Sequence, residues 1–167
     1  MDKYQEKGYI IVKKLITEEQ VSDMISYLDS YDNFSDKDLE PYSNIPYIYD
    51  NILGEDSPFH LLMNHPTLKQ ISNNILQKES KFYFLKVNNK SKWIGQDICY
   101  HQEFAVSKHM GLKENDSLQI FMALEPHTIE NGCLKVIEGS HNKELIHEDF
   151  FDTSFNHKVR VKYEDLE

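Results

Sequence analysis

The residues between Ser117 and Glu125 alternate between two sets of side chains. One set is aliphatic and consists of Leu118, Ile120, Met122 and Leu124. The other set lies between them and consists of Gln119, Phe121 and Ala123. Successive side chains of a β-strand point to opposite faces of the sheet, so this spacing predicts a strand with one aliphatic face.

Other segments also have the composition of strands, and they are Tyr9–Val12, Lys81–Val87, Cys99–Phe104, Cys133–Ile137 and Lys158–Tyr163. Turn residues such as Asn131 and Gly132, which tolerate positive φ, separate neighbouring segments. Short strands joined by turns predict a mainly β protein with a double-stranded β-helix, or jelly roll. Only about five core strands are recognisable where this fold has roughly eight, so we expect the β-helix to be incomplete.

Two helices are expected in the N-terminal half, in front of most of the strands. Thr17 to Gln20 has the form of a capping box, in which both side chains satisfy free backbone N–H groups. Helical spacing follows to about Tyr31, at Val21, Met24, Ile25 and Leu28. A second helix is expected to open at His65 and Pro66, with its buried stripe formed by Leu68, Ile71 and Ile75.

Composition limits the class of protein. The chain has 167 residues, which predicts one domain over 1–167. The formal net charge is −10 and Arg160 is the single arginine, so a nucleic-acid partner is not expected. There is no apolar run of membrane-spanning length and no signal-peptide core at the N-terminus. With two cysteines, Cys99 and Cys133, we expect reduced thiols in a cytoplasmic protein without a membrane partner.

The segment Cys99–Phe104 carries the chemistry that we consider most informative. Residues two apart in a strand share a face, so His101 and Glu103 are predicted to point the same way. One imidazole and one carboxylate are two of the three ligands in the 2-His-1-carboxylate site of non-haem Fe(II) oxygenases. A polar strand face without a metal is the alternative interpretation of the same pair.

Four features in order resemble the phytanoyl-CoA dioxygenase (PhyH) family of Fe(II)/2-oxoglutarate oxygenases. They are the opening Gly8–Val12, the helix behind Thr17, the segment His101–Glu103, and the block from Asn131-Gly132-Cys133-Leu134 to Gly139-Ser140-His141. The last block is the most specific of the four. The resemblance implies a hydroxylase with Fe(II) held by His101 and Glu103, 2-oxoglutarate as cosubstrate and a small-molecule substrate.

The chain departs from the family pattern in two respects. The family usually has Asp where this chain has Glu103. The family's distal His and its 2-oxoglutarate-binding Arg lie on later strands, whereas this sequence ends at Glu167. We therefore expect a domain truncated at its C-terminus, with self-association through open strand edges and apolar faces.

The resemblance suggests three further cofactor-binding residues, namely Lys86, Gln102 and Phe121. Lys86 would offer a cation to 2-oxoglutarate, and a solvated strand-end lysine is the alternative. Gln102 matches a family residue near the cofactor, although an ideal strand would point it to the opposite face. Phe121 matches an aromatic position of the pocket, and core packing is the alternative.

The other histidines are expected to have different roles. For His141, in the Gly-Ser-His turn, we expect a structural or supporting role in preference to metal ligation. For His147 and His157 we expect surface positions or satisfied polar roles.

Two other functional classes are open. A non-catalytic binding module on the same scaffold would fold without turning over 2-oxoglutarate. A cupin-like metal isomerase or sugar-binding jelly roll would present His-x-His in place of the His-x-Glu found at His101–Glu103.

Overall fold

The computed structural model of the chain describes residues 2–30, 47–48, 54–85, 87–88, 99–107, 111–113, 116–145, 147–152 and 155–162. The helices are α1 (Asp2–Lys7), α2 (Glu18–Asp29), α3 (His60–Met63), α4 (Pro66–Leu76) and α5 (Glu103–Ser107), with a 3-10 turn at Ser140–Asn142. The strands are β1 (Tyr47–Ile48), β2 (Val87–Asn88), β3 (His147–Asp152) and β4 (Phe155–Val161).

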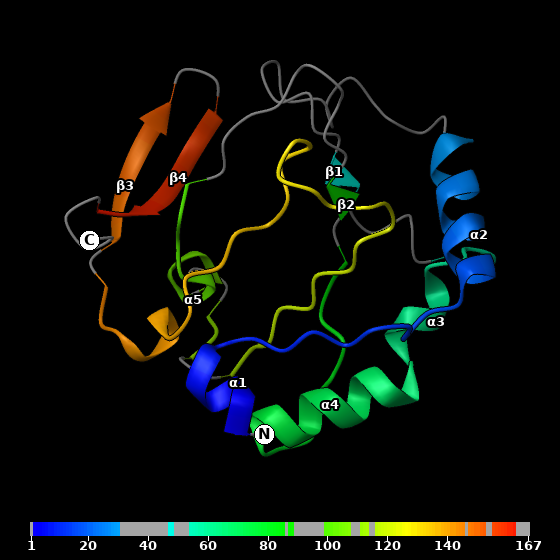
Figure 1. Cartoon of the computed structure of the whole chain (residues 1–167), viewed down its shortest axis with the longest axis horizontal. Coiled ribbons are helices and arrows are strands. Elements are labelled where there is room, and N and C mark those ends of the chain that lie inside the picture. The colour runs from blue at the N-terminus through cyan, green and yellow to red at the C-terminus, as the bar shows by residue number, and fades with distance from the viewer. Residues whose placement is uncertain are drawn as a thin grey trace.

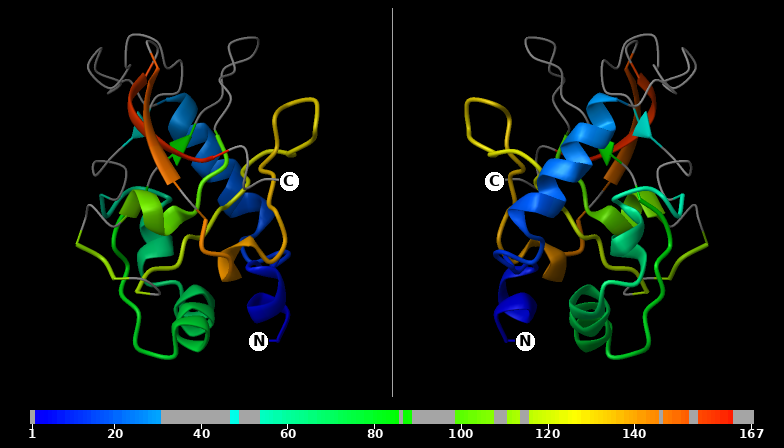
Figure 2. Two further views of the ribbon diagram at one scale, coloured as in Figure 1. Left: turned by 90° about the vertical axis from the view of Figure 1, so that its left-hand side faces the viewer. Right: turned by 90° about the vertical axis from the view of Figure 1, so that its right-hand side faces the viewer.

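The strands form two antiparallel pairs, β1 with β2 and β3 with β4. The β3–β4 hairpin and helix α2 lie at opposite ends of the long axis of the molecule (Figure 1). Side views place helices α1 and α4 at one end of the vertical axis and the hairpin toward the other (Figure 2). The site described below lies where the hairpin meets helix α5.

Both predicted helices are confirmed, and local chemistry explains where they begin. The Gln20 amide donates to Thr17 Oγ1 (3.2 Å) and the Thr17 amide donates to Gln20 Oε1 (2.9 Å), so the capping box is complete. Helix α4 begins with Pro66 in its first turn, and the Leu68 amide donates to Nδ1 of His65. It ends at Leu76, and the next residue, Gln77, has a left-handed backbone with φ of 54°.

The described core is small and lies between α2, α3 and the chain segments beside them. Its buried residues are Met24, Phe59 and Leu62. The ring of Tyr27 packs edge-on against Phe59, with centroids 6.2 Å apart. Partly buried residues from distant segments complete it, among them Leu85, Val87, Met122 and Leu124. Residues from the predicted strands therefore do reach the core.

The mainly β content that we predicted is not found in the described residues. Strand pairing is absent there from 9–12, 81–85, 117–125 and 133–137, whereas Val87 belongs to β2 and the predicted 158–163 strand overlaps β4. The facing of 117–125 is largely as predicted, since Leu118, Met122 and Leu124 are half-buried and Gln119, Phe121 and Ala123 are exposed. Ile120, however, is exposed. Apart from Ile120, the side chains of this segment thus keep the strand alternation, while its backbone lacks the ladder that defines a sheet.

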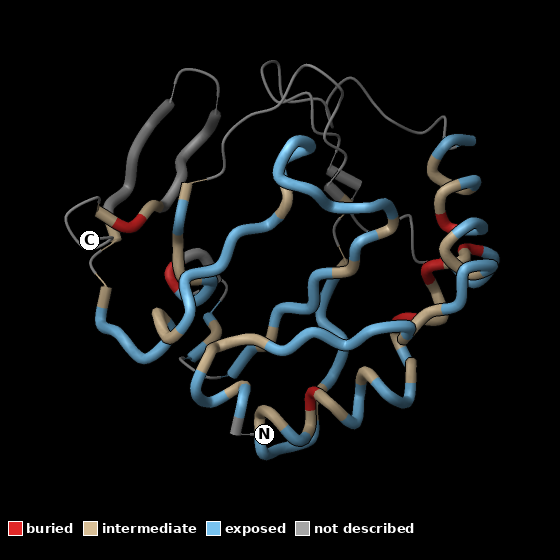
Figure 3. Tube along the Cα trace, in the orientation of Figure 1, coloured by how far each residue is buried: buried red, intermediate tan, exposed pale blue. Residues whose placement is uncertain are grey.

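Long exposed stretches separate the buried positions along the chain (Figure 3). Several of these stretches carry large apolar side chains, including Ile11 at 74%, Tyr83 at 65% and Leu134 at 59% exposure. Among the described residues, no helix has the length and apolar character needed to cross a membrane.

Candidate functional site

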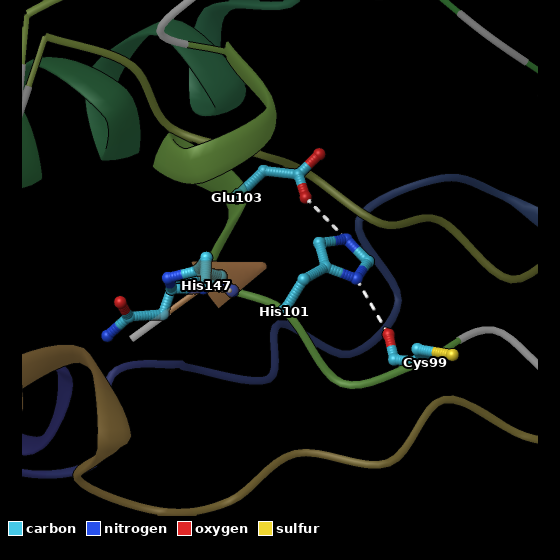
Figure 4. A network of polar contacts seen from close by, with 5 residues as sticks. Cys99, His101, Glu103 and His147 are labelled. Carbon is cyan, nitrogen blue, oxygen red and sulfur yellow. Dashed lines mark hydrogen bonds and ion pairs between the residues drawn. The ribbon is translucent and has the colours of Figure 1, made fainter. Parts of the chain in front are cut away.

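His101 and Glu103 lie side by side, as predicted, but not on a strand. Residues 99–102 have no regular secondary structure, and Glu103 begins helix α5. The Ala105 amide donates to the Gln102 carbonyl (3.0 Å), which bends the chain into the helix. The strand predicted over Cys99–Phe104 is therefore wrong, although the two side chains meet: His101 Nε2 is 3.1 Å from Glu103 Oε2 (Figure 4).

Both ring nitrogens of His101 face oxygen atoms. Nδ1 is 2.8 Å from the Cys99 carbonyl oxygen, which can only accept, so Nδ1 carries a proton. A neutral imidazole has one N–H, which would leave the Nε2 lone pair facing the Glu103 carboxylate. This contact between two electron-rich atoms becomes favourable when Nε2 carries a second proton or when a cation binds both Nε2 and Oε2. The arrangement therefore favours positive charge at this point.

The same geometry suits a divalent metal ion. Two ligands in adjacent positions of an octahedral site, with bonds of about 2.1 Å, lie about 3.0 Å apart. The separation of 3.1 Å between His101 Nε2 and Glu103 Oε2 is close to this value. The hydrogen bond from Nδ1 to a backbone carbonyl is the usual support of a metal-binding imidazole, because it fixes the tautomer and the ring plane.

The pair is partly open to solvent, with side-chain exposures of 26% for His101 and 45% for Glu103. Within the portion of the chain that the structure describes, no three His, Cys, Asp or Glu side chains gather as a metal site. His101 and Glu103 stay the predicted candidates for two of the three ligands of a facial site.

Gln102, between the two candidate ligands, is held at both its backbone and its side chain. Its backbone amide donates to Nε2 of His147 (3.0 Å). Its side-chain amide donates to the carbonyls of Ser140 (2.8 Å) and Lys143 (3.0 Å). These bonds join the candidate metal site to the Gly-Ser-His turn and to β3. The cofactor contact predicted for Gln102 stays a prediction.

The position of His147 is the feature that sequence reasoning missed. We expected a surface or satisfied polar role, and the ring is indeed hydrogen-bonded at both nitrogens. It also lies at the candidate site, 45 residues along the chain from its partner Gln102 (Figure 4). Nothing in the acidic sequence around residue 147 signals this contact, because its partner Gln102 is distant in the sequence and His147 lies at the start of the β3–β4 hairpin.

Of the other two predicted cofactor residues, only Phe121 lies in the part of the chain that the structure describes. Lys86 lies outside the described residues. Phe121 is half-exposed and packs edge-on against His127, with ring centroids 5.2 Å apart. The pocket role of Phe121 stays a prediction.

The turn that contains Ser140 and His141 also holds the N-terminus. Nε2 of His141 is 2.9 Å from the Gln5 carbonyl, and the Gly139 amide donates to the Lys7 carbonyl (3.1 Å). The structural role that we expected for His141 agrees with these contacts, which anchor helix α1.

An exposed ionic cluster extends this anchor. Lys7 Nζ and Tyr9 Oη each donate to Glu138 Oε1 at 2.8 Å. The hydrogen bond from Lys7, followed by that from Tyr9, holds the pKa of the Glu138 carboxyl below its ordinary value. The same carboxylate raises the pKa of Lys7 and of Tyr9, in each case chiefly through the hydrogen bond.

Comparison with known proteins gives one positive result. The model of the phytanoyl-CoA dioxygenase (PhyH) family matches residues 4–165. This match covers nearly the whole chain and indicates an oxygenase-type class of protein. The chain is a member of the phytanoyl-CoA dioxygenase family, whose fold is in general a jelly roll. No curated protein matches the chain, and no solved structure does.

Proposed function

We propose that the chain is an Fe(II)/2-oxoglutarate-dependent dioxygenase that hydroxylates a small molecule. The observation that carries the proposal is the 3.1 Å contact between His101 Nε2 and Glu103 Oε2, in a member of the PhyH family. The ring is already oriented by the Cys99 carbonyl, so its second nitrogen is the one to bind metal. Bound iron together with 2-oxoglutarate would supply the oxidation of a C–H bond by O₂.

The residues of the chain would hold and orient these groups. His101 and Glu103 would occupy two adjacent metal positions, and the remaining positions on one face would be open to cosubstrate. Helix α5 fixes the backbone of Glu103, while the Cys99 carbonyl fixes the ring of His101. We propose Lys86 as the cation for the distal carboxylate of 2-oxoglutarate, with Gln102 and Phe121 beside the cosubstrate.

Location and partners complete the proposal. Cys99 and Cys133 are free thiols in the structure, which agrees with a reducing compartment such as the cytoplasm. The net charge of −10 argues against a nucleic-acid substrate.

Anaerobic titration with Co(II) tests the metal site without requiring turnover. We expect the wild-type chain to bind Co(II), and His101→Ala to lose more affinity than the tenfold to hundredfold typical of supporting residues. His127→Ala is the matched control, because that imidazole is exposed and packs against Phe121. Equal affinity in wild type and His101→Ala would refute the assignment.

Release of succinate from 2-oxoglutarate then separates the enzyme from the alternative. A dioxygenase releases succinate when supplied with Fe(II), ascorbate and O₂, and His101→Ala does not. A folded chain that binds metal and releases no succinate above the His101→Ala background would be the non-catalytic binding module.

A further inference from the structure

His101 lies between two backbone groups that the β3–β4 hairpin holds. His147 and Val161 are directly opposite each other in the hairpin. The Val161 amide donates to the Tyr100 carbonyl (2.8 Å), and His147 Nε2 accepts from the Gln102 amide (3.0 Å). One cross-strand pair therefore fixes the residue before His101 and the residue after it. Val161 is only 3% exposed, so this junction is packed as well as hydrogen-bonded.

The hydrogen bonds of His147 assign its tautomer. Nδ1 is 3.0 Å from the Leu145 carbonyl, an acceptor, so this nitrogen carries the proton. Nε2 then presents its lone pair to the Gln102 N–H. A neutral ring satisfies both contacts, in contrast to His101, whose two nitrogens both face oxygens. In this arrangement the Nε2 lone pair of His147 is used by a backbone donor.

We infer that His147 is a positioning residue for the candidate metal pair, acting through the backbone of Gln102. This inference rests on the proposed function. The directions of the His101 and Glu103 side chains are set by the backbone on each side of Gln102, and the His147 bond holds that backbone. Because Glu103 begins a helix of five residues, the hydrogen bond also fixes the point at which the irregular segment turns into α5.

Two substitutions separate this role from direct metal ligation. His147→Phe keeps a planar ring and removes the acceptor, whereas His147→Gln offers an oxygen acceptor at about the same reach. A supporting residue of a metal site typically contributes tenfold to hundredfold in affinity. We expect Co(II) affinity to fall by about that factor in His147→Phe and to return to within about threefold of wild type in His147→Gln.

Loss of affinity in both variants, equal to the loss in His101→Ala, would show that His147 is itself a ligand and would overturn the inference. Unchanged affinity in His147→Phe would overturn it as well. If His147→Phe does not fold, His147→Leu takes its place, since it also removes the acceptor: positioning predicts a loss of about tenfold to hundredfold, no role predicts unchanged affinity, and ligation predicts a loss as large as in His101→Ala.

Nuclear magnetic resonance of the metal-free, ¹⁵N-labelled chain tests the positioning independently of metal binding. We expect the Gln102 amide to be protected from hydrogen exchange in wild type and in His147→Gln, and exposed in His147→Phe. The ring ¹⁵N shifts of His101 should change only in the Phe variant. Equal protection of Gln102 in all three chains would overturn the inference. A wild-type chain that binds no Co(II) but shows the expected protection would refute the proposed function and leave the positioning intact.

Discussion

Gly8 lies so close to the side chain of His141 that a Cβ at position 8 would force the imidazole ring to move. A Cβ built on Gly8 would overlap Nδ1 and Cγ of the His141 ring, and Gly8 has a φ of +82°. The Gly8 amide also caps helix α1 through a bond of 2.8 Å to the Tyr4 carbonyl. The glycine therefore lets the N-terminal helix end against the same turn that holds Gln102.

Gly8→Ala is expected to destabilise the chain for two reasons. The left-handed conformation disfavours an L side chain by about 1 to 3 kcal/mol, and the new methyl group would displace the His141 ring. Gly111→Ala is the matched control, because Gly111 has a φ of +77° and a methyl group added there would meet no atom within 4 Å. Urea unfolding should show a larger decrease in the free energy of unfolding for Gly8→Ala than for Gly111→Ala. Equal losses would mean that the contact with His141 contributes nothing.

Glu138→Gln should remove the part of the loss of stability in acid that comes from the contacts of Glu138 with Lys7 and Tyr9. The folded-state pKa of Glu138 is lowered, so the unfolded chain binds this proton more readily. The carboxylate therefore stabilises the fold fully above its ordinary pKa, and this contribution disappears as pH falls through the lowered folded-state pKa.

Thermal unfolding against pH measures this contribution. Wild type should exceed Glu138→Gln in melting temperature near neutral pH, and the two should converge in acid. Glu125→Gln, which neutralises another exposed carboxylate, is the control for net charge. A gap between wild type and Glu138→Gln that persists below the folded-state pKa would contradict the ionic explanation.

Local signals predicted the helices well because their determinants lie within a few residues. The capping box at Thr17 and the proline at position 66 need no distant partner. A strand does need a distant partner. The alternation of apolar and polar residues determines which face each side chain occupies, but the hydrogen-bonded ladder depends on a neighbouring strand that the local sequence does not specify. This explains why Met122 and Leu124 reach the core while their segment lacks strand pairing.

The proximity of His101 and Glu103 was predicted correctly, although the backbone that produces it was predicted wrongly; their role as metal ligands stays a prediction. Strand alternation and a turn into a helix both bring His101 next to Glu103, so the conclusion survived a wrong local structure. His147 could not be predicted in the same way. Its contact with Gln102 spans 45 residues and involves the first residue of β3, which pairs with Val161 of β4.

Thr17→Ala should weaken helix α2. The substitution removes the hydroxyl that accepts the Gln20 amide, and loss of such a cap typically costs about 1 kcal/mol. Ser22→Ala, at an exposed position inside the same helix, is the control and should have little effect or stabilise slightly. Urea unfolding followed by circular dichroism compares the two. A chain insensitive to Thr17→Ala would show that α2 is fixed by its packing around Met24 alone.

Self-association is the last expectation, and exposed apolar side chains supply its physical reason. Ile11 and Leu134 lie in segments without strand pairing and are 74% and 59% exposed, with further large apolar residues beside them. Such segments can pair with the same segments of a second copy and remove apolar surface from water.

We expect the mass measured by light scattering to rise with protein concentration. The double variant Ile11→Asn, Leu134→Asn keeps the charge at −10 and should shift association to higher concentration, whereas Gln119→Asn, at an exposed polar position, should not. A wild-type chain that stays monomeric at high concentration would exclude these segments as an interface between copies.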